Sequence, residues 1–155
     1  MKLTALLILS VTIPLSCEGQ SLSQCFQDAA NTYGVPQALL LSVASQESKM
    51  NPAAVHNNGQ SMDVGIMQIN TGWLKRSPFI GMRYKPEDLT DGCTNVKVGA
   101  WILAGLLRDY PLWDAVGRYN ASCRTLTRNQ CQAIRSAYEQ GVYRKWWHLM
   151  KVSQR

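Results

Sequence analysis

Apolar residues recur at the three- and four-residue spacing of an α-helix in two segments near the start of the chain. Residues 21–33 carry the first stripe, and Gly34 after them is a typical helix stop. The second stripe lies in residues 35–48, where Pro36 suits the opening turn. The apolar positions of the first stripe are Leu22, Phe26, Ala29 and Tyr33. The pattern predicts two consecutive helices.

One acidic residue falls on the apolar stripe of the second helix. The residues at i, i+3, i+4 and i+7 of this face are Leu40, Val43, Ala44 and Glu47. Burial of an ionised carboxylate is costly, so such a group keeps its proton to higher pH than a free glutamate does. A carboxylic acid that is protonated near neutral pH is what a general acid needs to cleave a glycosidic bond. The alternative is a helix-end glutamate that turns outward or caps a neighbour.

The second half of the chain carries three further helical patterns. Residues 95–109 have an apolar face and are predicted to form the central buried helix, and residues 112–118 a short one. A capping box formed by Thr127 and Gln130 opens a last helix that runs to about Met150. The apolar face of the central helix comprises Val98, Trp101, Ile102, Gly105 and Leu106.

Two stretches between these helices lack a helical pattern. Residues 50–62 are polar and rich in turn formers, which predicts a small β-like region or an irregular loop. Residues 71–75 suggest a short helix, and residues 77–92 an irregular connector. The 155-residue chain shows no internal repeat, and its length suits one domain, predicted to span residues 20–155.

Residues 1–19 resemble a secretory signal, with Lys2 followed by an apolar run and then small residues. The run is too short for a convincing membrane span. Cleavage after Gly19 is expected, which leaves a mature protein without a stable membrane span. Lipid anchoring through Cys17 is disfavoured, because the three residues before it do not match the usual lipoprotein pattern.

The formal net charge is +6, and it is unchanged by cleavage because residues 1–19 contain one basic and one acidic residue. A basic surface on an exported protein suits a polyanionic partner, for which the cell wall is a natural candidate. The Lys and Arg residues form no long cluster and no nucleic-acid recognition motif, so no nucleic-acid partner is expected.

Cleavage also leaves an even number of cysteines, which in an exported chain indicates disulfides. The four are Cys25, Cys93, Cys123 and Cys131. Three pairings are open, and we favour Cys123–Cys131, which are close in sequence, with Cys25–Cys93. A metal site is disfavoured, because there is no Cys-x-x-Cys motif and only His56 and His148 could add ligands.

Three ordered motifs resemble those of the soluble lytic transglycosylase family of the lysozyme superfamily. They are Glu47-Ser48, the Gly-Ile-Met-Gln-Ile-Asn segment of residues 65–70, and the Arg-Tyr-Asn-Ala-Ser segment of residues 118–122. The resemblance covers residues 25–151. It implies a lysozyme-like α+β fold that is predominantly helical, with a small irregular or β lobe and a glycan cleft. The third motif departs from the family pattern, with Arg118 in place of Ala and Ser122 in place of Gly.

The resemblance makes Glu47 the catalytic acid/base and implies that the second and third motifs line the glycan cleft. The candidate glycan contacts are Ser48, Gln68, Asn70, Tyr119 and Asn120, and Trp73, which stands beside the second motif, is the best candidate for stacking. The amides can both donate and accept hydrogen bonds, as sugar hydroxyls require, or else satisfy nearby backbone groups. The Tyr119 hydroxyl is expected near Glu47, unless Tyr119 is a core residue. Ser48 either forms a hydrogen bond with the acid or with the substrate N-acetyl group, or is an ordinary serine at a helix end.

Asp63 is a second candidate catalytic carboxylate. A retaining glycosidase needs a second carboxylate about 5–5.5 Å from the acid, and an inverting one about 6.5–9.5 Å. If Asp63 faces the cleft, the site becomes partly lysozyme-like. The alternative is an aspartate that caps or braces the turn.

The resemblance implies cleavage of the β-1,4 bond between N-acetylmuramic acid and N-acetylglucosamine in peptidoglycan. The product would carry a 1,6-anhydro ring, and no metal or organic cofactor is implied. The chain resembles small periplasmic transglycosylases that open the wall locally for secretion, conjugation or pilus machines. Two alternatives stay open: a true lysozyme that uses water, with Asp63 as second carboxylate, and a non-catalytic wall-binding adaptor on the same fold.

Overall fold

The computed structural model describes residues 20–153 of the chain. The predicted signal segment, residues 1–19, and the lipid-anchoring alternative at Cys17 lie outside the described residues. None of the helices in the described range is long and apolar enough to cross a membrane.

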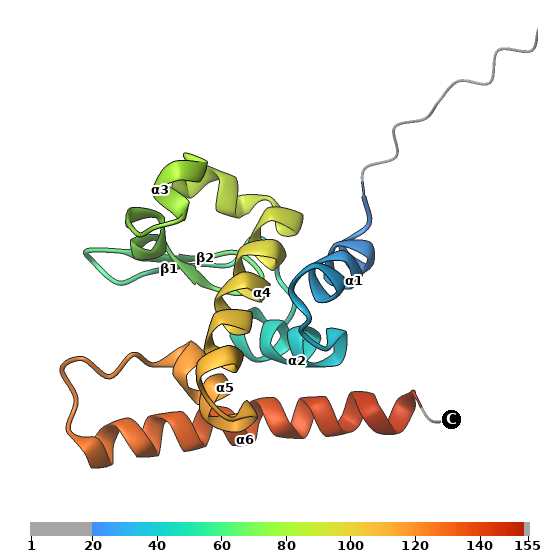
Figure 1. Ribbon diagram of the computed structural model, residues 1–155, viewed down its shortest axis with the longest axis vertical. Coiled ribbons are helices and arrows are strands. Elements are labelled where there is room, and N and C mark those ends of the chain that lie inside the picture. The colour runs from blue at the N-terminus through green and yellow to red at the C-terminus, as the bar shows by residue number, and fades with distance from the viewer. Residues whose placement is uncertain (1–19, 154–155) are drawn as a thin grey trace, which may run out of the picture.

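Six α-helices and a small sheet make up the described part of the chain (Figure 1). The helices are α1 (Leu22–Tyr33), α2 (Gln37–Ser48), α3 (Phe79–Met82), α4 (Gly92–Asp109), α5 (Leu112–Asn120) and α6 (Arg128–Val152). Two 3₁₀ turns, η1 (Thr71–Lys75) and η2 (Pro86–Thr90), lie between the sheet and α4. The lysozyme-like, mostly helical fold is therefore confirmed. Residues 77–92, predicted to be irregular, instead contain α3 and η2.

The caps in the structure agree with the predicted starts of α1 and α6, whereas α4 begins three residues before its predicted start and α5 ends two residues after its predicted end. The Ser21 side chain accepts a hydrogen bond from the backbone N–H of Gln24 at the start of α1, and Gly34 ends the helix with a φ of +66°. The capping box of Thr127 and Gln130 is present at the start of α6. These local signals are readable from the sequence because each involves residues within one helical turn.

The polar stretch after α2 and the segment that follows it form a three-stranded antiparallel sheet in the order β1-β2-β3. The strands are β1 (Val55–Asn57), β2 (Met62–Val64) and β3 (Ile69–Asn70). In this register Asp63 stands opposite His56 on β1 and opposite Asn70 on β3. Of the two structures predicted for this region, the small β lobe is confirmed.

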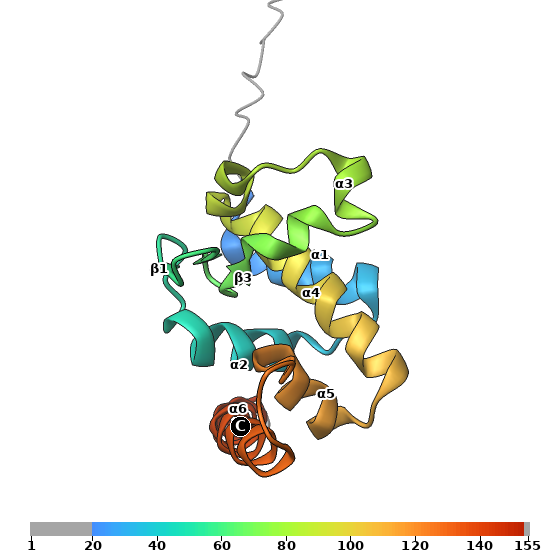
Figure 2. The same ribbon diagram turned by 90° about the vertical axis from the view of Figure 1, so that its left-hand side faces the viewer.

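Helix α4 lies at the centre of the fold and packs against α1 and α5, while α6 packs across α2 and α5 (Figures 1 and 2). The buried side chains of α4 include Val96, Ala100 and Leu103. The same apolar core takes in Leu40 and Val43 of α2, so the helix that carries Glu47 is fixed by burial of its apolar face. Figure 1 shows the sheet and α1 on opposite sides of α4.

The structure contains two disulfides, Cys25–Cys93 and Cys123–Cys131, which are the pairs favoured from the sequence. The first links α1 to the first turn of α4 across 68 residues, and the second closes a loop of 8 residues. In the chain-entropy model the long link stabilises the fold by about 4 kcal/mol and the short one by about 2.5 kcal/mol.

Candidate active site

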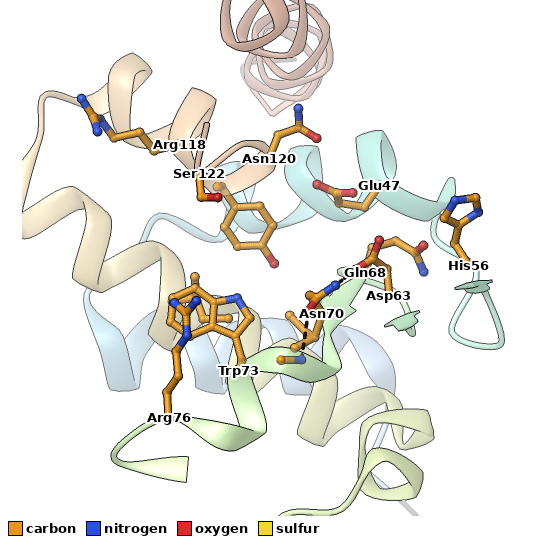
Figure 3. Close-up of a pocket in the computed structure, with 14 residues that line it drawn as sticks. Glu47, His56, Asp63, Gln68, Asn70, Trp73, Arg76, Arg118, Asn120 and Ser122 are labelled. Carbon is orange, nitrogen blue, oxygen red and sulfur yellow. Dashed lines mark hydrogen bonds between the residues drawn. The ribbon is translucent and has the colours of Figure 1, made fainter. Parts of the chain in front are cut away.

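A cavity of about 370 Å³ lies between the sheet and the helices, lined by parts of α2, the sheet, η1, α4 and α5 (Figure 3). It brings together residues from all three sequence motifs. The predicted site residues that line it are Glu47, Asp63, Gln68, Asn70, Trp73, Tyr119 and Asn120. Ser48 is the one predicted site residue outside the lining.

Glu47 projects into this cavity from the last turn of α2 and is partly buried. Burial raises the pKa of its carboxyl to about 7. A hydrogen bond donated by the Tyr138 hydroxyl to Oε1 opposes this rise, and the negative charge of Asp63 adds to it. Glu47 therefore keeps its proton close to neutral pH, as a general acid requires.

Tyr138 was not identified from the sequence. It is buried on α6, where Arg135, Tyr138 and Val142 follow one another at helical spacing on the inward face. The signal in the sequence is a tyrosine on the buried face of the helix, because a buried hydroxyl group needs a hydrogen-bond partner. Its partner lies 91 residues away, so no local pattern identifies Glu47 as that partner.

Replacing Tyr138 with Phe should raise the pKa of Glu47 further. The hydroxyl donates to the carboxylate and stabilises its ionised form, so its loss favours the protonated form. The alkaline limb of the pH–rate profile should therefore move above its wild-type midpoint near pH 7. Tyr143→Phe, on the exposed side of the same helix, is the matched control and should leave the limb in place. A downward shift in Tyr138→Phe would contradict this assignment.

Asp63 faces the cavity and also braces the sheet, so the two interpretations of this residue hold together. Its Oδ1 accepts a hydrogen bond of 2.7 Å from Asn70 Nδ2, and its Oδ2 accepts one of 2.7 Å from Asn58 Nδ2. These two amides fix the orientation of the carboxylate. Its negative charge adds to the raised pKa of Glu47.

Gln68 and Asn70 line the cavity, and their amide nitrogens are engaged within the loop. Gln68 Nε2 donates to the carbonyl oxygens of Gly65 at 2.9 Å and Ala54 at 3.2 Å. Asn70 Nδ2 donates to Asp63 and to Ser61, and Asn70 Oδ1 accepts from the Gly72 backbone N–H. Both residues therefore shape the wall of the cleft while presenting part of their side chains to it.

Two hydroxyl groups hold the backbone between Gly65 and Gln68. Ser48 donates to the Ile66 carbonyl at 2.7 Å, and Tyr119 donates to the Met67 carbonyl at 3.0 Å. Burial raises the pKa of the Tyr119 hydroxyl, and the nearby charge of Glu47 adds to this rise. The hydroxyl nevertheless donates its hydrogen bond to the backbone. The hydroxyl that binds Glu47 is thus that of Tyr138, and not that of Tyr119 as expected from the sequence.

Asn95 is a second residue that sequence inspection missed. Its fully buried amide donates to the carbonyls of Val64 at 2.7 Å and Leu89 at 2.9 Å and accepts from the Met67 N–H at 2.8 Å. Gly65 adopts a φ of +80°, and a Cβ there would lie 2.2 Å from Asn95 Nδ2. The glycine of the second motif therefore lets the loop approach α4 closely enough for these bonds.

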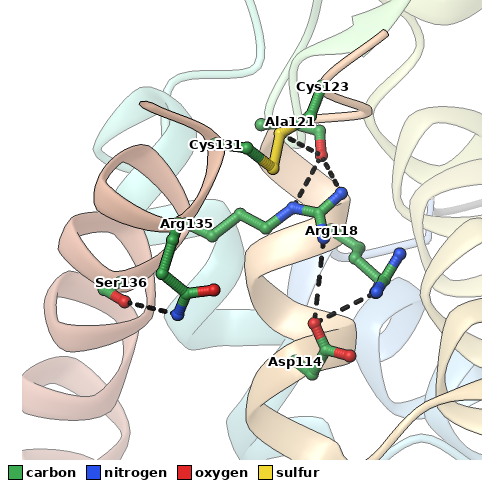
Figure 4. A network of polar contacts seen from close by, with 8 residues as sticks. Asp114, Arg118, Ala121, Cys123, Cys131, Arg135 and Ser136 are labelled. Atoms are coloured by element: carbon green, nitrogen blue, oxygen red, sulfur yellow. Dashed lines mark hydrogen bonds and ion pairs between the residues drawn. A yellow bond between two sulfur atoms is a disulfide. The ribbon is translucent and has the colours of Figure 1, made fainter. Parts of the chain in front are cut away.

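The third motif keeps its place in the cleft despite its two departures from the family pattern. The left-handed backbone conformation in this loop is at Cys123, with a φ of +58°, so Ser122 needs no glycine-like freedom. Arg135 donates to the Ala121 carbonyl through Nε at 3.1 Å and Nη2 at 2.9 Å (Figure 4). The Cys123–Cys131 disulfide ties the same loop to α6 (Figure 4).

Within residues 20–153, no group of three or more His, Cys, Asp or Glu side chains is arranged to hold a metal ion. The cavity is lined by carboxylate, amide, guanidinium, hydroxyl and imidazole groups and by one indole. Such a lining suits hydrogen bonding to sugar hydroxyl and N-acetyl groups together with stacking of a sugar ring.

A helical domain with a small antiparallel sheet and, in the cleft between them, a glutamate whose pKa is raised to about 7 has the architecture of the lysozyme-like class of proteins. A family model described as "Transglycosylase SLT domain" matches residues 24–142. The chain belongs to this family.

Curated relatives match most of the chain. It is 35% identical over 133 residues to "Invasion protein IagB" of Salmonella typhi, which covers 84% of this chain and 80% of the relative. It is 33% identical over 135 residues to "Protein IpgF" of Shigella flexneri, covering 85% of each. It is also 33% identical over 125 residues to "X polypeptide" of Escherichia coli (strain K12), covering 79% of this chain and 72% of the relative.

Proposed function

We propose that this protein is a peptidoglycan lytic transglycosylase. It cleaves the β-1,4 bond between N-acetylmuramic acid and N-acetylglucosamine and releases 1,6-anhydro-muramyl products. The observation that carries this proposal is Glu47, a carboxylic acid in the cleft whose pKa is raised to about 7. Membership of the transglycosylase family supports peptidoglycan as the substrate.

The reaction needs one residue that acts first as an acid and then as a base. Glu47 donates its proton to the glycosidic oxygen, the bond from the muramyl C1 to that oxygen breaks, and N-acetylglucosamine leaves with a free hydroxyl. The oxocarbenium-like charge at C1 is stabilised by the substrate N-acetyl group and by Asp63. The Glu47 carboxylate then takes the proton from the muramyl C6 hydroxyl, whose oxygen bonds to C1 and closes the ring.

Positioning of the glycan falls to the residues that surround these two carboxylates. We assign contacts with sugar hydroxyl and N-acetyl groups to Gln68, Asn70 and Asn120, and stacking to Trp73, all of which line the cavity. Ser48 and Tyr119 act through the backbone, because their hydroxyls hold the carbonyls of Ile66 and Met67. The mechanism uses no metal ion or organic cofactor.

A lysozyme-type hydrolase is the second candidate, and the orientation of Asp63 favours it. A fixed carboxylate in the cleft could activate water or stabilise the intermediate, as the second carboxylate of a muramidase does. In the transglycosylase mechanism Asp63 only assists, since the acceptor is a hydroxyl that the substrate itself supplies.

Asp63→Asn should therefore lower the cleavage rate clearly less than Glu47→Gln does. The amide keeps the size of the side chain but removes the charge that stabilises the positive transition state. Initial rates of cleavage on purified sacculi measure the effect. Asn58→Ala is the control for the geometry of the β1–β2 hairpin, because it removes a hydrogen-bond donor to Asp63 and leaves the carboxylate in place. Complete loss in both Asp63→Asn and Glu47→Gln, with the fold retained, would favour the hydrolase.

We place the protein in the periplasm as an exported enzyme that opens the wall locally while a secretion, conjugation or pilus apparatus assembles. The two disulfides fit an oxidising compartment, and the relative named an invasion protein supports a role in such a setting.

Release of soluble muropeptides from purified sacculi tests the proposal against a non-catalytic adaptor. The wild-type protein should solubilise the glycan without added metal, whereas an adaptor would sediment with the sacculi and release nothing.

A further inference from the structure

The C-terminal half of α6 presents an aromatic and basic surface to solvent on the side of the molecule away from the sheet. Figures 1 and 2 show α6 as the outermost helix, separated from the sheet by α2 and α5. Helical spacing places Tyr143, Arg144, Trp147 and Lys151 on one face, opposite the face that packs on α2 and α5. These four residues, the outer face of α6, are all exposed, and none of them lines the active-site cavity.

The aromatic rings of this face form one preformed surface. Tyr143 is 44% exposed and Trp147 is 48% exposed, and their rings stack with centroids 6.4 Å apart and an interplanar angle of 14°. Trp113 of α5 packs edge-on against Tyr143 at 5.2 Å and against Trp146 at 5.9 Å. Binding would therefore cost little ordering of these side chains. Exposed aromatic surface of this kind marks a site of interaction.

The charge of the outer face is positive and is not balanced within the described chain. Lys151 Nζ lies 5.1 Å from the centroid of the Trp147 ring. The ion pairs found among residues 20–153 include neither Arg144 nor Lys151. Residues 140–153 contain no Asp or Glu, and the carboxylate nearest in sequence, Glu139, is half-buried. The face thus combines two uncompensated cations with exposed aromatic rings.

This combination matches the surface of an anionic membrane. Tyr and Trp rings have an apolar body and a polar edge, which suits the headgroup level, and Lys and Arg stems let their charged ends reach the phosphates. A folded acidic partner would instead favour cations that are held at fixed positions. Arg144 and Lys151 are exposed and unpaired within residues 20–153, so their ends can adapt to a fluid layer of headgroups.

We propose that the outer face of α6 binds the surface of a membrane that contains anionic phospholipid. Tyr143 and Trp147 enter the headgroup layer, while Arg144 and Lys151 contact phosphates. The contact is peripheral and needs no spanning helix, in agreement with the helices of residues 20–153. Because the face and the cavity share no residue, the cleft stays open in the bound protein. This binding goes beyond the proposed glycan cleavage and does not depend on it.

Flotation with lipid vesicles tests the inference on the mature chain, residues 20–155. The wild-type protein should bind vesicles of phosphatidylethanolamine with phosphatidylglycerol, but not vesicles of phosphatidylcholine alone. Each Lys or Arg near an anionic surface contributes about fivefold in affinity, so Arg144→Gln combined with Lys151→Gln should weaken binding about 25-fold. Added salt should weaken binding of the wild type as well.

Lys97→Gln combined with Arg128→Gln is the matched control for net charge. Both residues are exposed, on α4 and at the start of α6. Arg128 lies about 24 Å along the helix from Arg144, well beyond the Debye length of about 8 Å at physiological salt. The control pair should therefore weaken binding less than about twofold. Equal losses in the two pairs would show adsorption by net charge alone and would overturn the inference.

The aromatic part is tested by Tyr143→Ser combined with Trp147→Ser, which should weaken binding about tenfold at unchanged charge. Ile80→Ser, at a 63% exposed position on α3, is the control and should bind as the wild type does. Circular dichroism verifies that each variant keeps its helices. Undiminished binding in the aromatic pair would overturn the inference.

Failure of the wild-type protein to bind vesicles with phosphatidylglycerol would overturn the inference without any variant, and would leave an acidic protein surface as the occupant of this face. The binding assay contains no glycan. Its failure therefore leaves the proposed function intact, and a protein that binds vesicles but cleaves no glycan would refute the proposed function alone.

Discussion

Replacing Glu47 with Gln is expected to lower glycan cleavage by about 10²–10⁴-fold, the range that general acid–base catalysis contributes. The substitution removes the only proton donor of the proposed first step and keeps the shape of the side chain. Tyr138 can still donate its hydrogen bond to the amide oxygen, so the local packing should persist. Initial rates of muropeptide release from sacculi measure the loss. A decrease of less than tenfold would exclude Glu47 as the acid.

The pH dependence of folding provides the control for this variant. The folded-state pKa of Glu47, about 7, lies above its ordinary value of 4.5, so the folded protein binds more protons between these values. Ionisation of Glu47 therefore costs wild-type stability as pH rises from 4.5 to 7. Above pH 7, the Glu47→Gln variant should resist unfolding by urea at least as well as the wild type does. A loss of activity in this variant is then due to the missing acid and not to unfolding.

Asn95→Leu is expected to lower the free energy of unfolding by about 3–5 kcal/mol. Leucine has a similar volume but leaves the carbonyls of Val64 and Leu89 and the N–H of Met67 buried without their partner. Each such orphaned group costs about 1–3 kcal/mol, and total stability is typically about 5–15 kcal/mol.

Urea unfolding monitored by circular dichroism measures this effect. Asn31→Leu on the exposed side of α1 is the matched control, and surface substitutions of this kind usually change stability by less than about 0.5 kcal/mol. A loss below about 1 kcal/mol in Asn95→Leu would show that Asn95 does not hold the second motif against α4.

The helices and the position of Glu47 could be predicted because the signals for them are local. Helical spacing placed Glu47 on the inward face of α2, and the capping box at Thr127 marked the start of α6 within one turn. The sheet was predicted only as one of two alternatives, because strands of two or three residues are too short for a clear alternation of apolar and polar positions.

The contacts that complete the site could not be read from the sequence, because they join distant segments. Tyr138 meets Glu47 across 91 residues, and Asn95 meets the Met67 backbone across 28. Tyr119 illustrates the difficulty most clearly. The family resemblance brought its hydroxyl close to Glu47, but the acceptor is a main-chain carbonyl, and every residue offers one.

Mass spectrometry of the products released from purified sacculi tests the central proposal most directly. The C6 hydroxyl is already tethered to the reacting sugar, which gives it an effective concentration of up to about 10⁵ M or more in well-oriented cases. The muropeptides should therefore end in 1,6-anhydro-N-acetylmuramic acid, one water lighter than the hydrolysis product. Products that end mainly in reducing N-acetylmuramic acid would contradict the transglycosylase mechanism and assign Asp63 the role of second catalytic carboxylate.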